Sequence, residues 1–546
     1  MPDPLALIST RQTPQILSAD LSQVENSSGG YAFTVDPMVQ LRRFLTLGTT
    51  GGTYYVAERA LTVAATTALQ DLVRSNGSAV VEEVLTISTS GRAPRVNPAL
   101  FALAMVAGIG DDDARGAALQ ALPRVARTGT HLFLFAGYVQ NFRGWGRGLR
   151  RAVGSWYSDK DADALAYQMV KYASREGWTH RDLLRLAHPA APGDAHRALY
   201  DWASGRTPST VLPNVVTASQ RAHQDGTAVD EVVREGHGLS WEMLPSASLN
   251  DRKVWEALLD NGLPLGALLR QLPRLTRLGL CDPMTATAAQ IVARLTDAAA
   301  LRRARLHPIA VLVALRTYAS GRSVAGTSHW TPSPVIVDAL DRAFYAAFGS
   351  VQPTGKRMLL ALDVSGSMTS PVGGLPISCR EASAALAMVT AAVEPSHRFV
   401  GFTAAGHPDR SWTERLLGRG SRTVPGIGPL TISPRQRLDD VIRSVSDLPF
   451  GRTDCALPME WALATRTKVD VFVIVTDNET YAGRVHPHQA LQEYRRAMGI
   501  DAKLVVVAMA ATEFSIADPR DAGMLDVSGF DASTPQLISD FAAGII

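Results

Sequence analysis

The stretch KRMLLALDVSGSM (residues 356–368) joins a run of aliphatic residues to an abrupt polar ending. The apolar run stops at Asp363, and Ser365 and Ser367 follow at alternate positions. A short, continuous apolar run is typical of a strand that is buried on both faces of a parallel sheet. The acid and the two hydroxyl groups would then stand at the carboxyl end of that strand, where such sheets bind their ligands.

The sequence after residue 354 repeats this pattern. Further continuous apolar runs lie at 398–405, 469–477 and 503–511, and helical patterns lie between them at about 380–393, 434–446 and 485–498. Apolar strands that alternate with helices predict a sheet covered on both faces. We therefore expect residues 355–546 to form a doubly wound α/β domain with a parallel sheet.

The spacing of apolar residues is different in the sequence before residue 355. From residue 36 to residue 354, apolar residues recur at three- and four-residue spacing, with breaks at Pro, Gly and Asn clusters, which predicts stacked helices. Residues 1–35 are left as an N-terminal segment. ALPRVARTG (121–129) and QLPRLTRLG (271–279) share one frame, which is either a reused helix-turn element of an irregular repeat or a coincidence.

A second strand of the α/β domain also ends in polar residues, at Thr476 and Asp477. A Gly-Arg-Thr loop (451–453) lies earlier in the sequence, before the helix that leads to this strand. Because the carboxyl ends of parallel strands meet at one edge of the sheet, several oxygen ligands would converge there. These are hard ligands without His or Cys, which favours Mg²⁺, with Ca²⁺ or Mn²⁺ as alternatives, over zinc. The other interpretation is an Asp-Ser turn that caps a helix. The candidate metal ligands are Asp363, Ser365, Ser367, Thr453 and Asp477.

Other motifs are absent from the sequence, and their absence limits the function. Residues 364–368 lack the glycines of a nucleophile elbow, and neither an HExxH helix nor a GxxxxGK[ST] loop occurs, so we expect no catalytic residues and no enzyme activity. The three cysteines stand singly and far apart, which fits a reducing cytoplasm. The longest aliphatic runs are too short to cross a bilayer and no signal peptide is visible, so we expect a cytoplasmic protein without a membrane partner.

Positive charge gathers in the helical part of the chain. Residues 1–354 carry 35 basic and 30 acidic side chains, whereas residues 355–546 carry 19 and 21. Between Ala114 and Ser158 there is no Asp or Glu, against seven arginines. Such a segment fits an anionic polymer such as RNA, although a solvated helical face would look the same.

The polar strand ends resemble the metal-ion-dependent adhesion site of von Willebrand factor A-like domains. The resemblance implies that Ser365 and Ser367 bind the metal directly and that Thr453 binds it directly or through water. It implies that Asp363 and Asp477 act largely through water.

Longer stretches resemble the Ro ribonucleoprotein family, over residues 36–546. In the C-terminal domain these are PTGKRMLLALDVSGSM (353–368), GRTDCALPMEWA (451–462), VFVIVTDNETYAGRVHP (471–487) and FSIADPRDAGMLDVSGFD (514–531). In the helical part they include LRRFLTLGTTGGTYYVAE (41–58), GWTHRDLLRLAHP (177–189) and HPIAVLVALRTYASG (307–321). The sequence is identified as a member of this family, a bacterial one.

The resemblance implies a ring of irregular HEAT-like helical repeats, the TROVE module, closed by the A-like domain. It implies that small noncoding Y-like RNA binds the basic outer surface and that single-stranded 3′ ends of misfolded RNA enter a central hole. It also implies RNA quality control or decay with an exoribonuclease. Closure within one chain would give a monomeric ring, which RNA could join into oligomers.

Several residues are then candidates for RNA contact. His180 matches a family position implicated in Y RNA binding, with Arg181 and Lys171 nearby; its other interpretation is a helix N-terminal residue beside a cap at Thr179. Arg124, Arg127, Arg274 and Arg277 are the candidates for the hole. Arg143, Arg147, Arg150 and Arg151 alternate with glycines and Trp145, either as a mobile segment that grips single strands or as a solvated loop.

The preferred function is thus that of a non-enzymatic RNA-binding protein. The alternative is a metal-dependent adhesion or scaffold module in which RNA binding is incidental.

Overall fold

The structure is a computed structural model that describes most of the chain. The described residues are 12–26, 29–34, 37–47, 67–89, 96–175, 177–304, 306–324, 326–369, 371–372, 376–404, 426–446, 452–476, 480–509, 514–528 and 534–544.

A long helical module occupies the middle of the chain. The helices of its first half are α1 (Pro37–Leu47), α2 (Thr67–Thr89), α3 (Asn97–Ile109), α4 (Asp112–Val125), α5 (Gly129–Val139), α6 (Arg147–Ser158), α7 (Ala162–Lys171), α8 (His180–Ala187) and α9 (Asp194–Ala203). Those of its second half are α10 (Asn214–Ala222), α11 (Val229–Arg234), α12 (Arg252–Asp260), α13 (Leu265–Arg277), α14 (Ala286–Thr296), α15 (Ala298–Arg303), α16 (Pro308–Ala319) and α17 (Pro334–Ala346). A small hairpin, β3 (Ser174–Arg175) and β4 (Trp178–Thr179), precedes α8, and 3₁₀ turns lie at η4 (Trp241–Met243), η5 (Ser248–Asn250) and η6 (Ala347–Ser350).

Local sequence explains where many of these helices begin. Asp111 caps α4 by accepting a hydrogen bond from the Ala114 amide at 2.8 Å, and Asp161 caps α7 in the same way. Such side chains satisfy amides that have no partner within the helix. Apolar positions at helical spacing then bury one side of most helices against their neighbours, whereas α3 is buried on all sides over Pro98–Ala107.

The C-terminal domain, here called the sheet domain, has the alternating architecture that the sequence predicts. Its sheet contains β5 (Met358–Asp363), β6 (His397–Phe402), β7 (Ile427–Leu430), β8 (Val471–Thr476), β9 (Lys503–Ala508) and β11 (Met524–Ser528), in the order β11-β9-β8-β5-β6-β7. All neighbours are parallel except β7, which is antiparallel to β6 at one edge. The helices around it are α18 (Cys379–Val393), α20 (Leu438–Ser446), α21 (Leu457–Ala464), α22 (Pro487–Met498) and α23 (Thr534–Ala543), with a 3₁₀ turn η7 (Gly366–Thr369) after β5.

Both faces of this sheet are buried, which explains the uninterrupted apolar strands. Leu360 and Leu362 of β5 pack in one apolar cluster with α18, α20 and α23, whereas Leu359 and Ala361 pack in another with α21 and α22. Because side chains alternate between the two faces of a strand, every position must be apolar. The predicted doubly wound α/β fold is confirmed.

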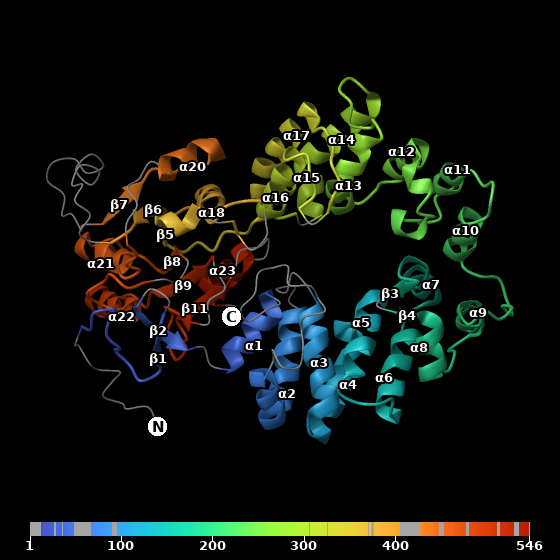
Figure 1. The fold of residues 1–546 in the computed structure, drawn as a ribbon, viewed down its shortest axis with the longest axis horizontal. Helices are drawn as coiled ribbons and strands as arrows, with labels where there is room; N and C mark the ends of the chain where they lie inside the picture. Colours follow the sequence, from blue (N-terminus) through green and yellow to red (C-terminus); the bar gives the residue numbers. More distant parts are fainter. Residues whose placement is uncertain are drawn as a thin grey trace.

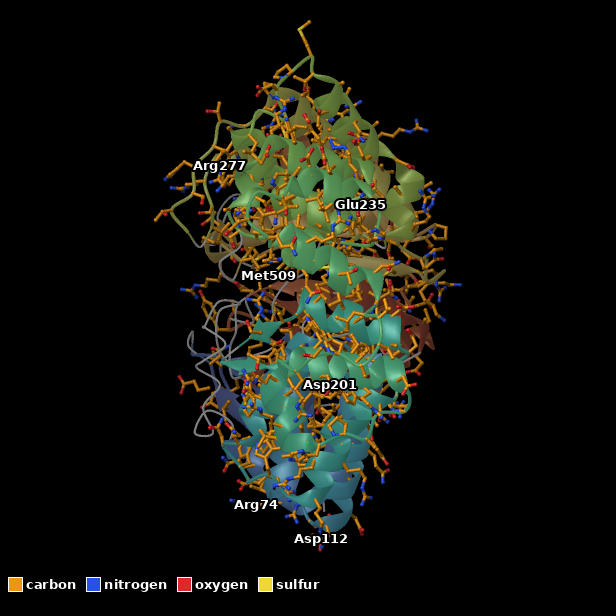
Figure 2. All side chains as sticks on the ribbon, turned by 90° about the vertical axis from the view of Figure 1, so that its right-hand side faces the viewer. Arg74, Asp112, Asp201, Glu235, Arg277 and Met509 are labelled. Atoms are coloured by element: carbon orange, nitrogen blue, oxygen red, sulfur yellow. The ribbon has the colours of Figure 1, made fainter. Side chains whose placement is uncertain are left out.

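The helical module starts and ends beside the sheet domain (Figure 1). The chain leaves along α1 to α9, turns back through α10 to α12, and returns through α13 to α17, where α16 contacts α18. Seen from the side, Arg277 and Glu235 of the second half lie above Asp201 and Asp112 of the first half (Figure 2). The first half has an apolar core of its own, whereas the core of the second half continues into the sheet domain.

Residues 12–34, here called the arm, precede the helical module in sequence but pack on the sheet domain. The arm forms β1 (Gln23–Glu25) and β2 (Tyr31–Thr34), and β2 pairs with β10 (Phe514–Ser515). Sequence reasoning treated this region only as an N-terminal segment. In the structure the described residues of the arm pack with the sheet domain, so this segment folds with residues 355–546 and not with the helical module.

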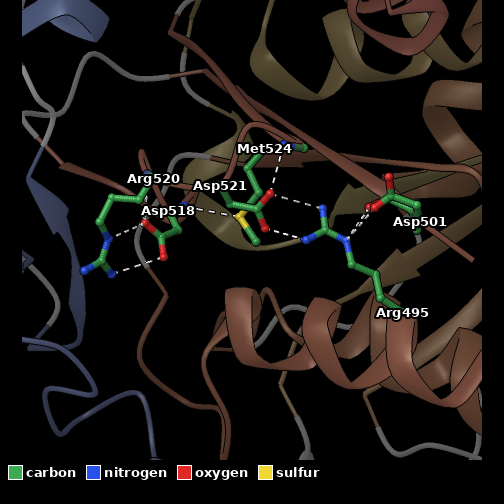
Figure 3. A network of polar contacts seen from close by, with 8 residues as sticks. Arg495, Asp501, Asp518, Arg520, Asp521 and Met524 are labelled. Carbon is green, nitrogen blue, oxygen red and sulfur yellow. Dashed lines mark hydrogen bonds and ion pairs between the residues drawn. The ribbon is translucent and has the colours of Figure 1, made fainter. Parts of the chain in front are cut away.

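Two arginines fix the loop between β10 and β11 (Figure 3). Arg495 of α22 forms ion pairs with Asp521 at 2.5 Å and with Asp501 at 3.8 Å. Arg520 bonds Asp518 at 3.1 Å and reaches Asp20 of the arm at 2.8 Å. Burial raises the pKa of Asp20, but hydrogen bonds from Ser22 and Arg520 outweigh burial and lower the pKa to about 2. The arm is thus held by charge as well as by strand pairing.

Candidate functional site

The loop after β5 holds Asp363 in a defined orientation. Its side chain is 1% exposed, and its Oδ1 accepts a hydrogen bond from the Ser365 amide at 2.8 Å. Its Oδ2 accepts a hydrogen bond from the Thr476 hydroxyl at 2.9 Å, so the ends of β5 and β8 are joined by a side chain. The carboxylate therefore stands at the carboxyl edge of the sheet, as the sequence predicts.

A second loop, residues 452–456, lies beside the first. Thr453 is 4% exposed, and its backbone carbonyl accepts hydrogen bonds from the Tyr481 and Ala482 amides, both at 3.2 Å. Two residues further on, the Cys455 thiol lies 3.8 Å from the Thr476 hydroxyl that bonds Asp363. Burial raises the pKa of this thiol, and the charge of Asp363 adds to the effect. The structure thus brings the two loops to one place.

Two of the five predicted ligands have side chains that lie outside the described part of the structure. The backbone of Ser367 lies in η7, but its side chain lies outside the described part of the chain, and Asp477 lies outside the described residues altogether. The ligand roles of all five residues remain predictions.

The donors that are described suit a hard cation. Asp363, Ser365 and Thr453 offer oxygen atoms only, and all three side chains are buried at the sheet edge. Hydroxyl and carboxylate oxygens are the ligands that Mg²⁺, Ca²⁺ and Mn²⁺ prefer.

Arg380 is a further member of the site that sequence reasoning missed. It lies at the start of α18, is 6% exposed, and its Nη2 donates to the Ser365 carbonyl at 3.4 Å. Burial lowers the pKa of its guanidinium, and the negative charge of Asp363 opposes that effect. No sequence signal marks this arginine, because its partner is a backbone carbonyl.

His180 lies in the core of the helical module. It is 4% exposed, its Nδ1 lies 2.8 Å from the Tyr157 hydroxyl, and its ring packs against Phe133 and Trp156. Thr179 caps α8 as the sequence predicts, with Asp182 completing a capping box. The ring therefore does not reach the surface in this structure. An effect of His180 on RNA binding would act through the residues around it.

Burial also makes His180 sensitive to acid. Burial lowers the pKa of His180 to about 4, although the carbonyl groups of Gln168 and Tyr172 oppose this. An unfolded histidine titrates near pH 6.5. Between pH 6.5 and 4 the unfolded chain therefore binds a proton at this histidine that the folded chain does not bind. Stability is therefore fully present above pH 6.5 and falls as the pH drops toward 4.

We expect His180→Gln to melt at a lower temperature than the wild type at pH 7.5. Its free energy of unfolding should fall less than that of the wild type when the pH is lowered, and the two decreases should differ by about 3 kcal/mol at most. Thermal unfolding midpoints between pH 7.5 and 4.5 measure it, with His329→Gln at an exposed histidine as control. Parallel pH profiles for wild type and His180→Gln would contradict the assignment.

The neighbours of His180 differ in exposure. Arg181 is exposed on α8. Lys171 ends α7, with its Nζ 3.2 Å from the Tyr167 hydroxyl and 4.0 Å from Glu242. Burial disfavours the charge of Lys171, but these two partners outweigh it and raise its pKa. Lys171 thus remains charged, but it is partly engaged within the protein.

The segment around Trp145 is ordered, contrary to the expectation of a mobile basic loop. Arg143 donates to the Ala107 carbonyl at 2.7 Å, and the Trp145 ring lies 6.0 Å from Trp178. Helix α6 begins at Arg147, because its buried face, with Leu149, Val153 and Trp156 among others, packs into the core. The glycines of this segment do not prevent the helix, since tertiary packing outweighs their low helix propensity.

The first turns of α6 carry cations without partners. Arg147, Arg150 and Arg151 are exposed, and none forms an ion pair or a side-chain hydrogen bond with a described residue. Positive charge near a helix N-terminus is opposed by the helix dipole, by about 0.3–1 kcal/mol for each charge. The charge of Arg147, in the first turn, is therefore unfavourable, and none of the three arginines is neutralised by a described residue, which favours a role in binding an anion.

The two echoed frames have the same local structure. Each forms the end of a helix that contains an internal proline, Pro123 in α4 and Pro273 in α13. Arg124 and Arg277 are exposed, Arg127 bonds the Ser88 carbonyl at 2.8 Å, and Arg274 lies over the Trp255 ring at 5.9 Å. The four candidates for the hole thus come from opposite halves of the helical module.

Fold and site together define a class of protein: a helical-repeat module that contacts, at both ends, an A-type domain with oxygen-bearing side chains at the carboxyl ends of its strands. The chain matches the TROVE domain family over residues 24–208 and 236–321, and the Ro60 vWA domain family over residues 357–542. The chain belongs to the Ro60 family.

Two curated relatives are each named RNA-binding protein RO60. The chain is 40% identical to the one from Deinococcus radiodurans over 548 residues, which is 99% of each protein, and 36% identical to the one from Caenorhabditis elegans over 605 residues, which is 96% of this chain and 90% of that protein. The crystal structure of the Deinococcus radiodurans RO (RSR) protein matches with a TM-score of 0.77 at 39% identity. The match covers 94% of this chain and 100% of that one.

Proposed function

We propose that this protein binds RNA through its helical module and catalyses no reaction on it. The observation that carries the proposal is the row of exposed arginines at the start of α6, which form no ion pair with any residue that the structure describes and lie within a stretch that has no acidic residue from Ala114 to Ser158. Relatives named as RNA-binding proteins support it. Arginines of this kind contact phosphates, so affinity arises mainly from the RNA backbone.

In this proposal the ligands are a small structured Y-like RNA on the outer surface and single-stranded 3′ ends of misfolded RNA in a central hole. The work of the complex is RNA quality control or decay, with an exoribonuclease as partner. The chain acts as a monomeric ring that RNA can join into oligomers. The cytoplasm is the proposed location, and the three buried, free cysteines suit it. No helix in the described ranges is long and apolar enough to cross a bilayer.

We also propose that the sheet edge holds Mg²⁺, with Ca²⁺ or Mn²⁺ as alternatives, on Asp363, Ser365, Ser367, Thr453 and Asp477. A cation held there would supply positive charge for a carboxylate or phosphate of a partner. The buried oxygen donors favour this second activity, metal-dependent protein adhesion. It is also the rival function, if RNA binding proves incidental.

One binding experiment separates the two activities. A structured RNA with and without a single-stranded 3′ tail is titrated with the protein over a salt series, in Mg²⁺ and in EDTA. We expect tighter binding with the tail, a steep fall of affinity with salt, and little change in EDTA, since the arginines and not the metal hold the RNA. Absence of binding at low salt would refute RNA binding and leave adhesion as the main function.

A further inference from the structure

Gln15 is fully buried in the arm and uses both ends of its side-chain amide. Its Oε1 accepts hydrogen bonds from the Thr480 hydroxyl at 2.7 Å and from the Gly483 amide at 3.1 Å. Its Nε2 donates to Asp454 Oδ1 at 2.8 Å and to the Val485 carbonyl at 2.9 Å. A glutamine amide offers two donor hydrogens and one acceptor oxygen, so all of its capacity is engaged.

The partners of Gln15 belong to two separate loops of the metal site proposed above. Asp454 follows the candidate ligand Thr453, whereas residues 480–485 form the loop that follows the end of β8. The two loops also bond each other, because the Cys455 amide donates to the Thr480 hydroxyl at 3.1 Å. Gln15 therefore joins the second and third loops of the site across 439 residues of sequence.

The backbone of the arm continues the same contact. The Gln15 amide donates to the Gly483 carbonyl at 3.1 Å, and the Gln15 carbonyl accepts from the Tyr31 amide at 2.8 Å. Asn26 adds a hydrogen bond from its side chain to the Thr480 carbonyl at 2.8 Å. The arm thus holds the third loop through its backbone and through two side chains.

Close approach at two glycines shows how tightly these parts fit. A side chain at Gly483 would overlap the Gln15 amide nitrogen and Asp454 Oδ1, and one at Gly30 would overlap the Thr480 carbonyl. Only glycine allows these backbones to lie so near their neighbours. The arm and these two loops are therefore closely packed against one another.

We propose that Gln15 is a positioning residue of the metal site and that the arm forms one of its walls. This inference rests on the proposed cation site. Ligand atoms must be held within a few tenths of an ångström for tight binding, and residues that support the ligands supply that order. Thr453 is bonded to the loop that Gln15 holds, so Gln15 helps to place the Thr453 hydroxyl, although it contacts no candidate ligand atom in the described part of the site.

The test compares Mn²⁺ binding of full-length variants by electron paramagnetic resonance. Gln15→Ala removes the amide, and Gln15→Met keeps its length without hydrogen bonds. We expect both to weaken Mn²⁺ binding about tenfold or more, because the typical cost of losing a supporting residue is 10–100-fold in metal affinity. Gln220→Ala, at an exposed position on α10, is the matched control and should bind as the wild type does.

A second readout follows the loops without metal. Hydrogen exchange at the amides of Cys455 and Gly483 should become faster in both Gln15 variants, while the helical module exchanges as in the wild type. Mn²⁺ affinity and exchange equal to the wild type in Gln15→Ala would overturn the proposal and leave the metal site intact. A wild type that binds no Mn²⁺ would overturn the metal site and, with it, the positioning role of Gln15.

Discussion

Replacing Asp363 with alanine should abolish binding of divalent cations and leave RNA affinity unchanged within about twofold. We expect the dissociation constant for Mn²⁺ to rise by about two orders of magnitude or more, because removing one ligand-orienting carboxylate typically costs 10–100-fold and this one also carries the charge of the site. The substitution further removes the acceptor for the Ser365 amide and the Thr476 hydroxyl. Two buried donors then lose this acceptor, so we expect a loss of stability of about 1–3 kcal/mol for each.

The same two strands provide a matched control at their other end. Asp470 precedes β8 and forms an ion pair with Arg357, which precedes β5. Asp470→Asn should lower stability without changing Mn²⁺ binding, since Asp470 lies at the amino ends of these strands and Asp363 lies at their carboxyl ends. Calorimetric titration with Mn²⁺ and thermal unfolding of the two variants measure both effects. If Asp363→Ala and Asp470→Asn reduce Mn²⁺ binding equally, the metal is not held at the carboxyl edge.

The sheet domain could be predicted from the sequence because burial on both faces leaves a continuous apolar signal. The expected strands around 358–363, 469–477 and 503–511 correspond to β5, β8 and β9, and the expected helix at 380–393 corresponds to α18 (Cys379–Val393). Polar residues that follow such strands stand out against the apolar background. This is why the sequence alone places Asp363 and Ser365 at the carboxyl end of a strand.

The arm could not be placed in the same way. Its anchors are polar contacts between residues far apart in sequence, such as Gln15 with Asp454, and hydrogen bonds of this kind leave no periodic pattern. The one available signal is the alternation of QVENSSGGYAFT (23–34), which is typical of a hairpin. Because the arm covers the start of α22, His486 and His488 are buried.

The exposure of polar residues in the helical module could not be predicted from the sequence either. The sequence leaves His180 either as a helix N-terminal residue or as an RNA contact, and only packing against Phe133 and Trp156 decides that it is buried. In contrast to His180, the structure shows that Arg147, Arg150 and Arg151 are exposed. They lie at the start of a helix, where positive charge is unfavourable.

Neutralising these three arginines should therefore change stability and RNA affinity in opposite directions. The triple variant Arg147→Gln, Arg150→Gln and Arg151→Gln removes the unfavourable interaction of Arg147 with the dipole of α6 and breaks no ion pair with a described residue, so the melting temperature should stay the same or rise slightly. RNA with a single-stranded tail should bind more weakly. If all three contact phosphates, the slope of log affinity against log salt should become shallower by about 2.

A second triple variant controls for the loss of charge alone. Arg466→Gln, Lys468→Gln and Arg496→Gln remove three exposed cations from the sheet domain and should leave the salt slope unchanged. Fluorescence anisotropy over a salt series measures both variants, and thermal unfolding checks their fold. Equal losses of affinity in the two variants would mean that only net charge attracts RNA. An unchanged slope in the α6 variant would remove this helix from the RNA interface. A loss confined to the α6 variant, without a loss of stability, would identify these arginines as binding residues, since a structural role would lower both quantities together.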